Sequence, residues 1–187
     1  MRTLLMAMAI LTIGGCAAVP STTTMPSDVD TPGQAPVSAP ASAPAPPKDP
    51  APAGLFVEMR AASHPGYDRL VFEFGGDKPP SHRIEPVDEV RHDPTDKLIP
   101  LQGKRFVRVV FDGAVLDTAQ WESDPAKSRR YTGPDRITPG LPLVKEVAIA
   151  GSFEAVLSFG VGLSGQAEMK VEVLSSPARL VIDFRRQ

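Results

Sequence analysis

The sequence predicts an all-β domain, an antiparallel β-sandwich or a partly closed barrel of about eight strands, preceded by a disordered linker. From Leu55 onward, apolar side chains recur at every second position, which is the period of a half-buried strand. Turn signals built from Gly, Pro, Asp and Ser separate these runs, and no segment shows the 3.6-residue period of a helix. The composition also changes sharply, since ten of the 21 prolines fall between Pro20 and Pro52.

The N-terminus carries the features of an export signal. Arg2 supplies a positive charge, and Leu4 to Ile13 form an apolar stretch too short to cross a bilayer, which needs about 20 residues. The run Ile13-Gly14-Gly15-Cys16 resembles the lipobox of bacterial lipoproteins. That resemblance implies a signal peptide over residues 1–15, cleavage before Cys16 and lipidation of its thiol by a diacylglyceryl (palmitate-type) group. The alternative is an ordinary signal peptide with a chance cysteine.

A lipid anchor of this kind fixes the expected location. Two acyl chains hold a protein stably on a membrane without a spanning helix. We therefore expect the chain to be lipid-anchored to the cell membrane on its extracytoplasmic face. Cys16 is the only cysteine, so disulfides within the chain and cysteine-based zinc sites are excluded. The formal net charge of −2 gives no sign of a nucleic-acid binder.

Residues 16–53 form the predicted linker. They contain no aromatic residue and no apolar periodicity, and their prolines disfavour both helix and sheet. Such a segment cannot bury enough apolar surface to offset the entropy of ordering it. We expect an extended, disordered spacer that lifts the domain away from the bilayer.

The predicted domain spans residues 54–187. Its strands follow from the alternation of apolar and polar side chains, as in Leu70, Phe72 and Phe74 against Val71 and Glu73. Gly160 and Gly162 lie inside one of these patterns, where glycine often marks a bulge. In chain order the predicted strands cover 55–60, 70–74, 82–87, 106–111, 143–149, 153–163, 169–173 and 180–184.

One long stretch, residues 113–142, interrupts this rhythm. Connections longer than about 12–15 residues are usually functional or disordered. Aromatic faces stack on sugar rings, and the Arg fork holds carboxylates. The alternative is that the aromatic residues only pin the loop to the domain. The candidate ligand-binding residues are Trp121, Arg129, Arg130, Tyr131 and Arg136.

Catalytic and metal-binding patterns are absent from the sequence. No Gly-x-Ser-x-Gly elbow occurs, and the pair Ser63-His64 is adjacent in sequence, which does not make a triad. The three histidines lack metal-ligand spacing, and the acids around Asp93 and Asp96 lack the pattern of a calcium loop. We expect no enzyme activity, no metal and no cofactor.

Several short motifs resemble those of a known family. The stretch from Ser176 to Phe184 resembles the terminal signature of AMIN domains, a Pro followed by Arg-Leu-Val-Ile-Asp and a hydrophobic residue, and Gly66 to Leu70 resembles their early strand. Tyr131 to Gly140 and Gly151 to Leu157 are similar to stretches of the AMIN-like domain of actinobacterial lipoproteins. The resemblance covers roughly Leu55 to Phe184.

The resemblance implies a domain that binds at the cell wall and does not itself catalyse a reaction. AMIN domains are β-sandwiches attached to cell-wall amidases and pilus secretins, where they are thought to bind peptidoglycan. No amidase sequence follows here before Gln187, so catalysis is not carried over. We expect a non-catalytic module of the cell envelope that associates with peptidoglycan. The alternatives are a scaffold for another envelope protein, such as a hydrolase or a transporter, and an uncharacterised hydrolase.

Overall fold

The structure is a computed structural model that describes residues 51–186. The predicted signal peptide, the lipidation of Cys16 and the linker up to residue 50 lie outside the described residues. Within them, no helix has the length and apolar character that crossing a bilayer requires.

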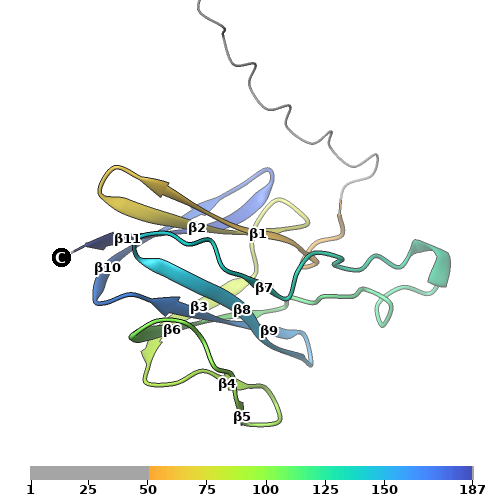
Figure 1. The fold of residues 1–187 in the computed structure, drawn as a ribbon. Helices are drawn as coiled ribbons and strands as arrows, with labels where there is room; N and C mark the ends of the chain where they lie inside the picture. Colours follow the sequence, from red (N-terminus) through yellow and green to blue (C-terminus); the bar gives the residue numbers. More distant parts are fainter. Residues whose placement is uncertain (1–50, 187) are drawn as a thin grey trace, which may run out of the picture. The chain divides into compact units, whose positions relative to one another are not determined.

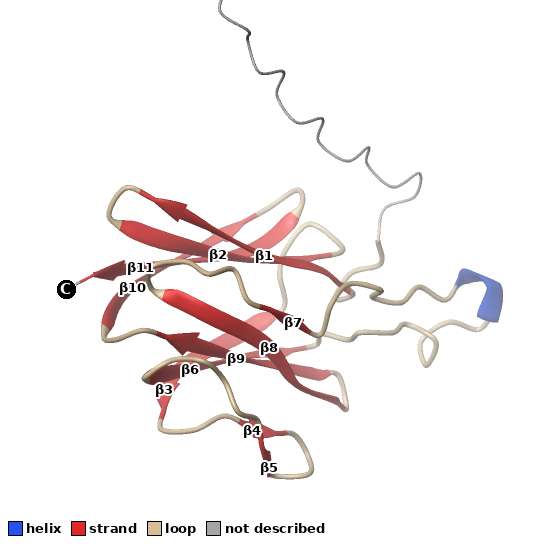
Figure 2. Cartoon of the chain, in the orientation of Figure 1, coloured by secondary structure: helices blue, strands red, loops and turns tan. Residues whose placement is uncertain are grey.

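The described domain is a β-sandwich of two main antiparallel sheets (Figures 1 and 2). The first sheet has the order β1-β2-β11-β10 and the second has the order β3-β6-β9-β8-β7. A small hairpin and one 3₁₀ turn complete the secondary structure. The bounds are β1 Phe56–His64, β2 Tyr67–Phe74, β3 Ser81–Val87, β4 Arg91–His92, β5 Lys97–Leu98, β6 Arg105–Asp112, η1 Pro125–Lys127, β7 Arg136–Ile137, β8 Val144–Phe153, β9 Val156–Leu163, β10 Ala167–Leu174 and β11 Ala178–Arg186.

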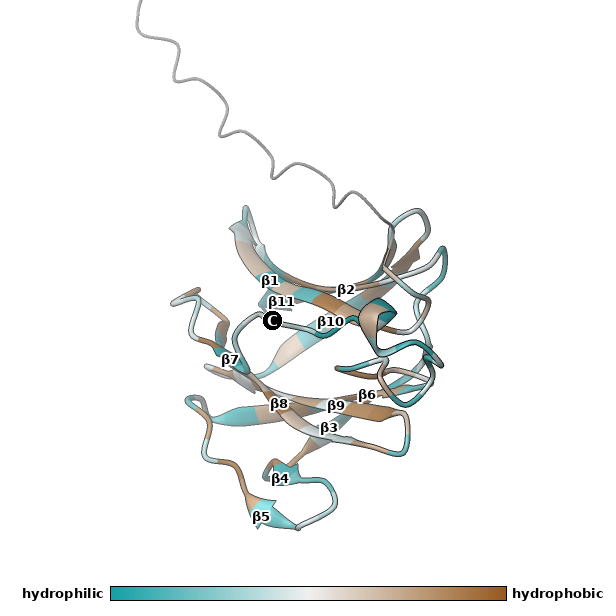
Figure 3. Cartoon of the chain, turned by 90° about the vertical axis from the view of Figure 1, so that its right-hand side faces the viewer, coloured by the Kyte–Doolittle hydropathy of each residue, from teal (hydrophilic) through white to brown (hydrophobic). Residues whose placement is uncertain are grey.

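The core lies between the two sheets, which Figure 3 shows as separate curved layers. Every second residue of each strand points into this space, and phenylalanines fill its centre. The rings of Phe72 and Phe159, one from each sheet, lie 4.6 Å apart between centroids. Phe74 and Phe111 repeat this contact across the layers at 4.6 Å. The alternation read from the sequence is therefore the alternation between core and outer face.

All eight predicted strands are present, but the predicted strand over 153–163 is wrong at its start. Phe153 ends β8, and Glu154 and Ala155 form a two-residue turn before β9 begins at Val156. Both turn residues have positive φ, 50° for Glu154 and 59° for Ala155. Turns of this kind usually carry Gly or Asn, and neither residue type occurs at these two positions, so no turn was predicted here.

The glycines of β9 allow another segment to approach the outer face of the second sheet closely. A Cβ at Gly162 would collide with the carbonyl oxygen of Gln102, and one at Gly160 would collide with Val90. The segment 88–104, which contains the β4–β5 hairpin, packs here on the side away from the first sheet (Figure 1). The bulges of the β8–β9 pair lie elsewhere, at 144–146 and 149–151 on β8. The expected bulge at Gly160 and Gly162 is thus a site of close approach instead.

The two sheets do not close into a barrel. β10 and β3 each have a hydrogen-bonded neighbour on one side only, and they do not pair with each other. Of the two predicted architectures, the sandwich is therefore the one that forms. This leaves one open side, where the edge strand of each sheet lies beside the entrance to the core.

Candidate ligand-binding site

The predicted functional loop forms an arm, residues 113–135, that projects from the sandwich (Figure 1). Its outgoing and returning segments are joined by an isolated antiparallel bridge between Asp117 and Arg130. Its base is held by backbone hydrogen bonds from Tyr131 N–H to the Leu116 carbonyl (2.8 Å) and from Thr118 N–H to the Arg129 carbonyl (2.9 Å). The tip contains η1, which the side chain of Asp124 caps by accepting from Ala126 N–H. The arm is thus an ordered part of the domain.

Two of the five predicted ligand residues have structural roles. The ring of Tyr131 packs against Phe56 with centroids 4.8 Å apart, and its hydroxyl donates to the Pro134 carbonyl at 2.8 Å. Burial raises the pKa of Tyr131, so the phenol stays neutral. Arg136 donates to the buried carboxylate of Glu146. The contacts of Tyr131 are those that the alternative interpretation describes, in which the aromatic residues pin the long loop to the domain.

The other three predicted residues lie along the arm. Arg130 forms an exposed ion pair with Asp117, and the backbone of Arg129 pairs with Thr118. Trp121 is 47% exposed, and its ring lies close to Gly54. None of the five residues lines either of the two hollows described below. The structure therefore spreads the predicted set along the arm and does not gather it around one cavity.

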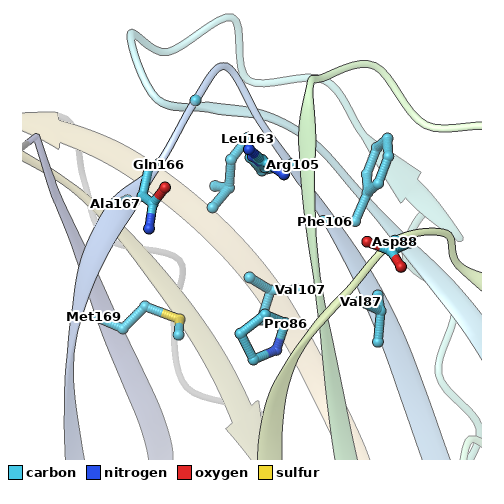
Figure 4. A pocket seen from close by; sticks show the side chains of 11 residues that line it. Pro86, Val87, Asp88, Arg105, Phe106, Val107, Leu163, Gln166, Ala167 and Met169 are labelled. Carbon is cyan, nitrogen blue, oxygen red and sulfur yellow. The ribbon is translucent and has the colours of Figure 1, made fainter.

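The first hollow lies at the open side of the sandwich, between β10 and the strands β3 and β6 (Figure 4). It has a volume of about 350 Å³, within the range of small-ligand pockets. Met169 and Pro86 point toward one another across it, above Val107 of β6. Its lining is mixed: apolar side chains such as Pro86, Val107 and Met169 stand beside polar ones. We call this hollow the edge pocket; it is lined by Pro86, Val87, Asp88, Arg105, Phe106, Val107, Leu163, Gly165, Gln166, Ala167 and Met169.

Polar groups stand at one end of the edge pocket. Arg105 begins β6, and Gln166 lies in the turn that leads into β10. Within residues 51–186, neither side chain makes a hydrogen bond or an ion pair. Neither residue is recognisable as a site residue from the sequence, since Arg105 has the pattern of the polar start of a strand and Gln166 that of a turn. Only the pairing of β6 with β9, which sets Arg105 opposite Leu163, reveals their proximity.

The second hollow lies between the base of the arm and the β8–β9 turn. It has a volume of about 480 Å³ and includes the ring of Phe153, which is 50% exposed. Its ionisable side chains are acids, Asp117 and Glu154. Anionic groups would be repelled here, whereas the edge pocket offers a guanidinium. The edge pocket therefore suits an anionic group better than the second hollow does, although Asp88 also lines it.

Comparison with known families decides what kind of domain this is. The model of the AMIN-like domain matches residues 54–186. The chain belongs to the AMIN-like domain family. No curated protein and no solved structure matches the chain. The AMIN-like family is associated with binding in the cell envelope and to peptidoglycan.

The motif residues of this AMIN-like domain hold strands together. Arg69 of β2 donates two hydrogen bonds to Asp183 of β11, at 2.7 and 2.9 Å. The hydrogen bond from Arg69 lowers the pKa of Asp183, and the pKa of Arg69 is raised in return. This ion pair joins β2 to β11, so Asp183 serves the fold.

The histidines and acids considered above as metal ligands form no cluster in the described part of the AMIN-like domain. Across residues 51–186, no three acids or histidines converge as metal ligands would. His64 stacks on Tyr67 with centroids 4.8 Å apart, and His92 lies 3.0 Å from the Thr95 hydroxyl. The Asp93–Asp96 stretch forms the turn between β4 and β5.

Proposed function

We propose that this AMIN-like domain is a non-catalytic module of the cell envelope that binds peptidoglycan through the edge pocket. The observation that carries the proposal is a pocket that combines apolar side chains with the guanidinium of Arg105, which has no ion-pair partner in the described residues, in a domain of this family. The peptide stems of peptidoglycan combine short apolar side chains with a free carboxylate. The pocket offers a matching surface for each.

The chemistry of the edge pocket supports this ligand class. The side chains of Val107, Leu163 and Met169 supply the apolar floor that methyl groups would fill. Arg105 has its full set of donors available, and a guanidinium binds a carboxylate through two parallel hydrogen bonds. Gln166 adds an amide that can donate to, or accept from, a peptide group.

The proposal includes a lipid anchor at Cys16, because the N-terminal sequence resembles a lipobox. A diacylated cysteine would hold the chain on the extracytoplasmic face of the cell membrane. The proline-rich linker would then let the domain reach the wall, since such segments are extended.

The directions of the pKa shifts of Asp117 and Asp183 favour a non-catalytic role. The pKa of Asp117 is lowered by the N–H of Ala119 and by Arg130, and the pKa of Asp183 is lowered by Arg69. Both shifts favour the charged form that structural ion pairs use. Catalytic acids and bases are usually tuned the other way, toward neutral pH.

A second candidate function is a scaffold for another protein of the envelope. The open side of the sandwich favours it, because β10 is an unpaired edge with exposed apolar side chains. On this alternative, the edge pocket would receive a side chain of a protein partner.

The experiment is co-sedimentation of the full chain, kept in detergent, with purified peptidoglycan, with soluble muropeptides as competitors. The chain should be retained, and muropeptides should release it. Arg105→Ala should weaken retention by about tenfold, because a charge-assisted hydrogen bond contributes about 1.5–3 kcal/mol. Arg105 makes no contact that the fold needs, so the variant should melt like the parent.

Arg130→Ala is the matched control, because it removes an exposed arginine of the arm instead. It should leave retention unchanged. If Arg130→Ala weakens retention and Arg105→Ala does not, the binding site is the arm. A parent chain that stays in the supernatant at all peptidoglycan concentrations would overturn the wall-binding function.

A further inference from the structure

Strand β10 is the one long edge of the two main sheets that has no bulge and no proline. It runs for eight residues in unbroken register with β11. The other edges are blunted: β1 carries an irregularity at 56–58, β3 contains Pro86, and β7 has two residues. Bulges, prolines and shortness keep any strand from pairing with an edge, whereas charged side chains, the only such feature of β10, discourage only partners of like charge. β10 is therefore free to accept a further strand.

The core-facing side of β10 is incompletely covered. Val171 and Val173 stand opposite Ile182 and Leu180 of β11, which are fully buried. Residues opposite each other in an antiparallel pair share a face, so both valines point to the core side. They are nevertheless 40% and 46% exposed, because β10 lies at the open side of the sandwich. A neighbouring strand would cover them.

The outer face of β10 carries alternating charges. Glu168, Lys170 and Glu172 occupy successive outward positions, and none forms an ion pair or hydrogen bond within residues 51–186. A strand with the order Glu-x-Lys-x-Glu can complement a copy of itself when the two run antiparallel. The charge pattern thus indicates which partner strand fits.

We propose that two copies of this chain pair through β10, antiparallel, about a two-fold axis at Val171. Val171 then faces Val171 of the second copy. Each Lys170 faces the second copy's Glu172, and each Met169 faces its Val173. The two four-stranded sheets become one continuous sheet of eight strands. Such an interface uses the same surface on both copies, as two-fold dimers do.

Other registers of this pairing fit less well. A slip by one residue sets core-facing side chains against outer-facing ones, which the pleat forbids. An axis at Lys170 would oppose two lysines, and an axis at Glu172 would oppose two glutamates. An axis at Met169 keeps opposite charges together but pairs fewer residues of the strand, which begins at Ala167. The axis at Val171 satisfies both the charges and the length.

The test exchanges the charges on β10. Full-length parent, Lys170→Glu and Glu172→Lys chains are compared by sedimentation velocity in detergent, with fewer than one copy per micelle. The parent should associate as its concentration rises. Each variant opposes like charges at two symmetric positions and should associate about tenfold more weakly, since each cross-strand pair contributes about 0.2–1 kcal/mol.

An equimolar mixture of the two variants supplies the decisive result. One copy then presents two acids and the other two lysines, so the mixed pair regains both attractions. The mixture should associate within threefold of the parent, and thermal melts of each variant should match the parent, which separates lost pairing from lost folding. A parent that stays monomeric, or variants that associate as it does, would overturn the proposal. A mixture of folded variants that fails to associate would equally exclude this pairing.

This outcome is independent of the peptidoglycan assay. Arg105→Ala leaves β10 unaltered, so a failure of wall binding would leave the self-association intact. A parent that is monomeric but binds an envelope protein through β10 would instead support the scaffold function and overturn the pairing of two copies.

Discussion

At the scale of single residues, buried carboxylates fix parts of the chain that are far apart in sequence. Asp68 of β2 is 1% exposed, and one of its oxygens accepts from the N–H groups of Leu143 and Val144 at 2.6 and 2.9 Å. Its other oxygen accepts from the Ser63 hydroxyl. The carboxylate thereby satisfies backbone donors at the entry to β8 that would otherwise be buried without partners.

The ion pair of Asp183 should make the stability of the domain depend on pH. Its pKa is lower in the folded chain than in the unfolded one, chiefly because Arg69 donates hydrogen bonds to it. The ion pair therefore stabilises the fold above the unfolded carboxyl pKa of about 3.9, and this contribution is lost as the pH falls through the folded value. Asp183→Asn should cost on the order of 1–2 kcal/mol at pH 7.

The measurement is urea unfolding of the parent and Asp183→Asn at several pH values from 7 to 3. The difference in the free energy of unfolding between the two chains should shrink as the pH falls below about 5. A difference that stays constant down to pH 3 would show that the ionised form of Asp183 does not contribute through this pair.

At the scale of elements, the β8–β9 turn has unfavourable positive φ angles and is held in place by hydrogen bonds. The Ala155 carbonyl accepts from the N–H groups of Gly113 and Ala114, at 2.8 and 2.9 Å. These bonds dock the turn onto the start of the arm. Side chains with a Cβ are disfavoured at positive φ by about 1–2 kcal/mol per residue. Tertiary contacts thus keep Glu154 and Ala155 in a conformation that their own preferences oppose.

Ala155→Gly should therefore stabilise the domain by about 1 kcal/mol, because glycine adopts positive φ without strain. Gly66, in the β1–β2 turn with φ of 87° and open space around it, offers the reverse test. Gly66→Ala should destabilise the domain by a similar amount. Thermal denaturation measures both changes in stability. An Ala155→Gly chain that melts at a lower temperature than the parent would contradict the claim that the backbone of Ala155 is strained.

At the scale of the whole domain, one charged cluster fastens the 88–104 segment to the second sheet. Arg136 of β7 donates to the Pro100 carbonyl at 3.0 Å and to the carboxylate of Glu146 on β8. The same carboxylate accepts from Gln102 N–H at 2.6 Å. The segment is thus held by this cluster at one end and by the close approach of Gln102 to Gly162.

Arg136→Ala should leave the Glu146 carboxylate buried without a counterion and cost roughly 1–3 kcal/mol of unfolding free energy. Adding Glu146→Gln should recover part of the loss, because it removes the unpaired charge. Arg130→Ala, which breaks an exposed pair, should change stability by less than about 1 kcal/mol. Urea unfolding compares the three chains, and equal losses for Arg136→Ala and Arg130→Ala would contradict this role for Glu146.

Sequence patterns predicted most strands because the core contacts follow a local period. Leu70, Phe72 and Phe74 alternate in the sequence and all three are buried in the structure. The same reasoning failed at Glu154 and Ala155, where the turn depends on hydrogen bonds from residues 113 and 114. The candidate site residues were predicted from their aromatic or basic side chains. The sequence does not show which of these side chains already contact other residues of the domain. Arg136 and Tyr131 are occupied by Glu146 and Phe56, whereas Arg105 is unpaired.

The sequence by itself determined the all-β class and indicated the AMIN-like family, since these rest on local alternation and on short motifs. Only the tertiary structure decided that the sheets stay open, where the edge pocket lies and that β10 remains an unpaired edge. The physical reason is that pairing partners and uncovered surfaces are set by contacts between residues distant in sequence. Leu163 and Arg105 meet only because β6 and β9 are neighbours in one sheet.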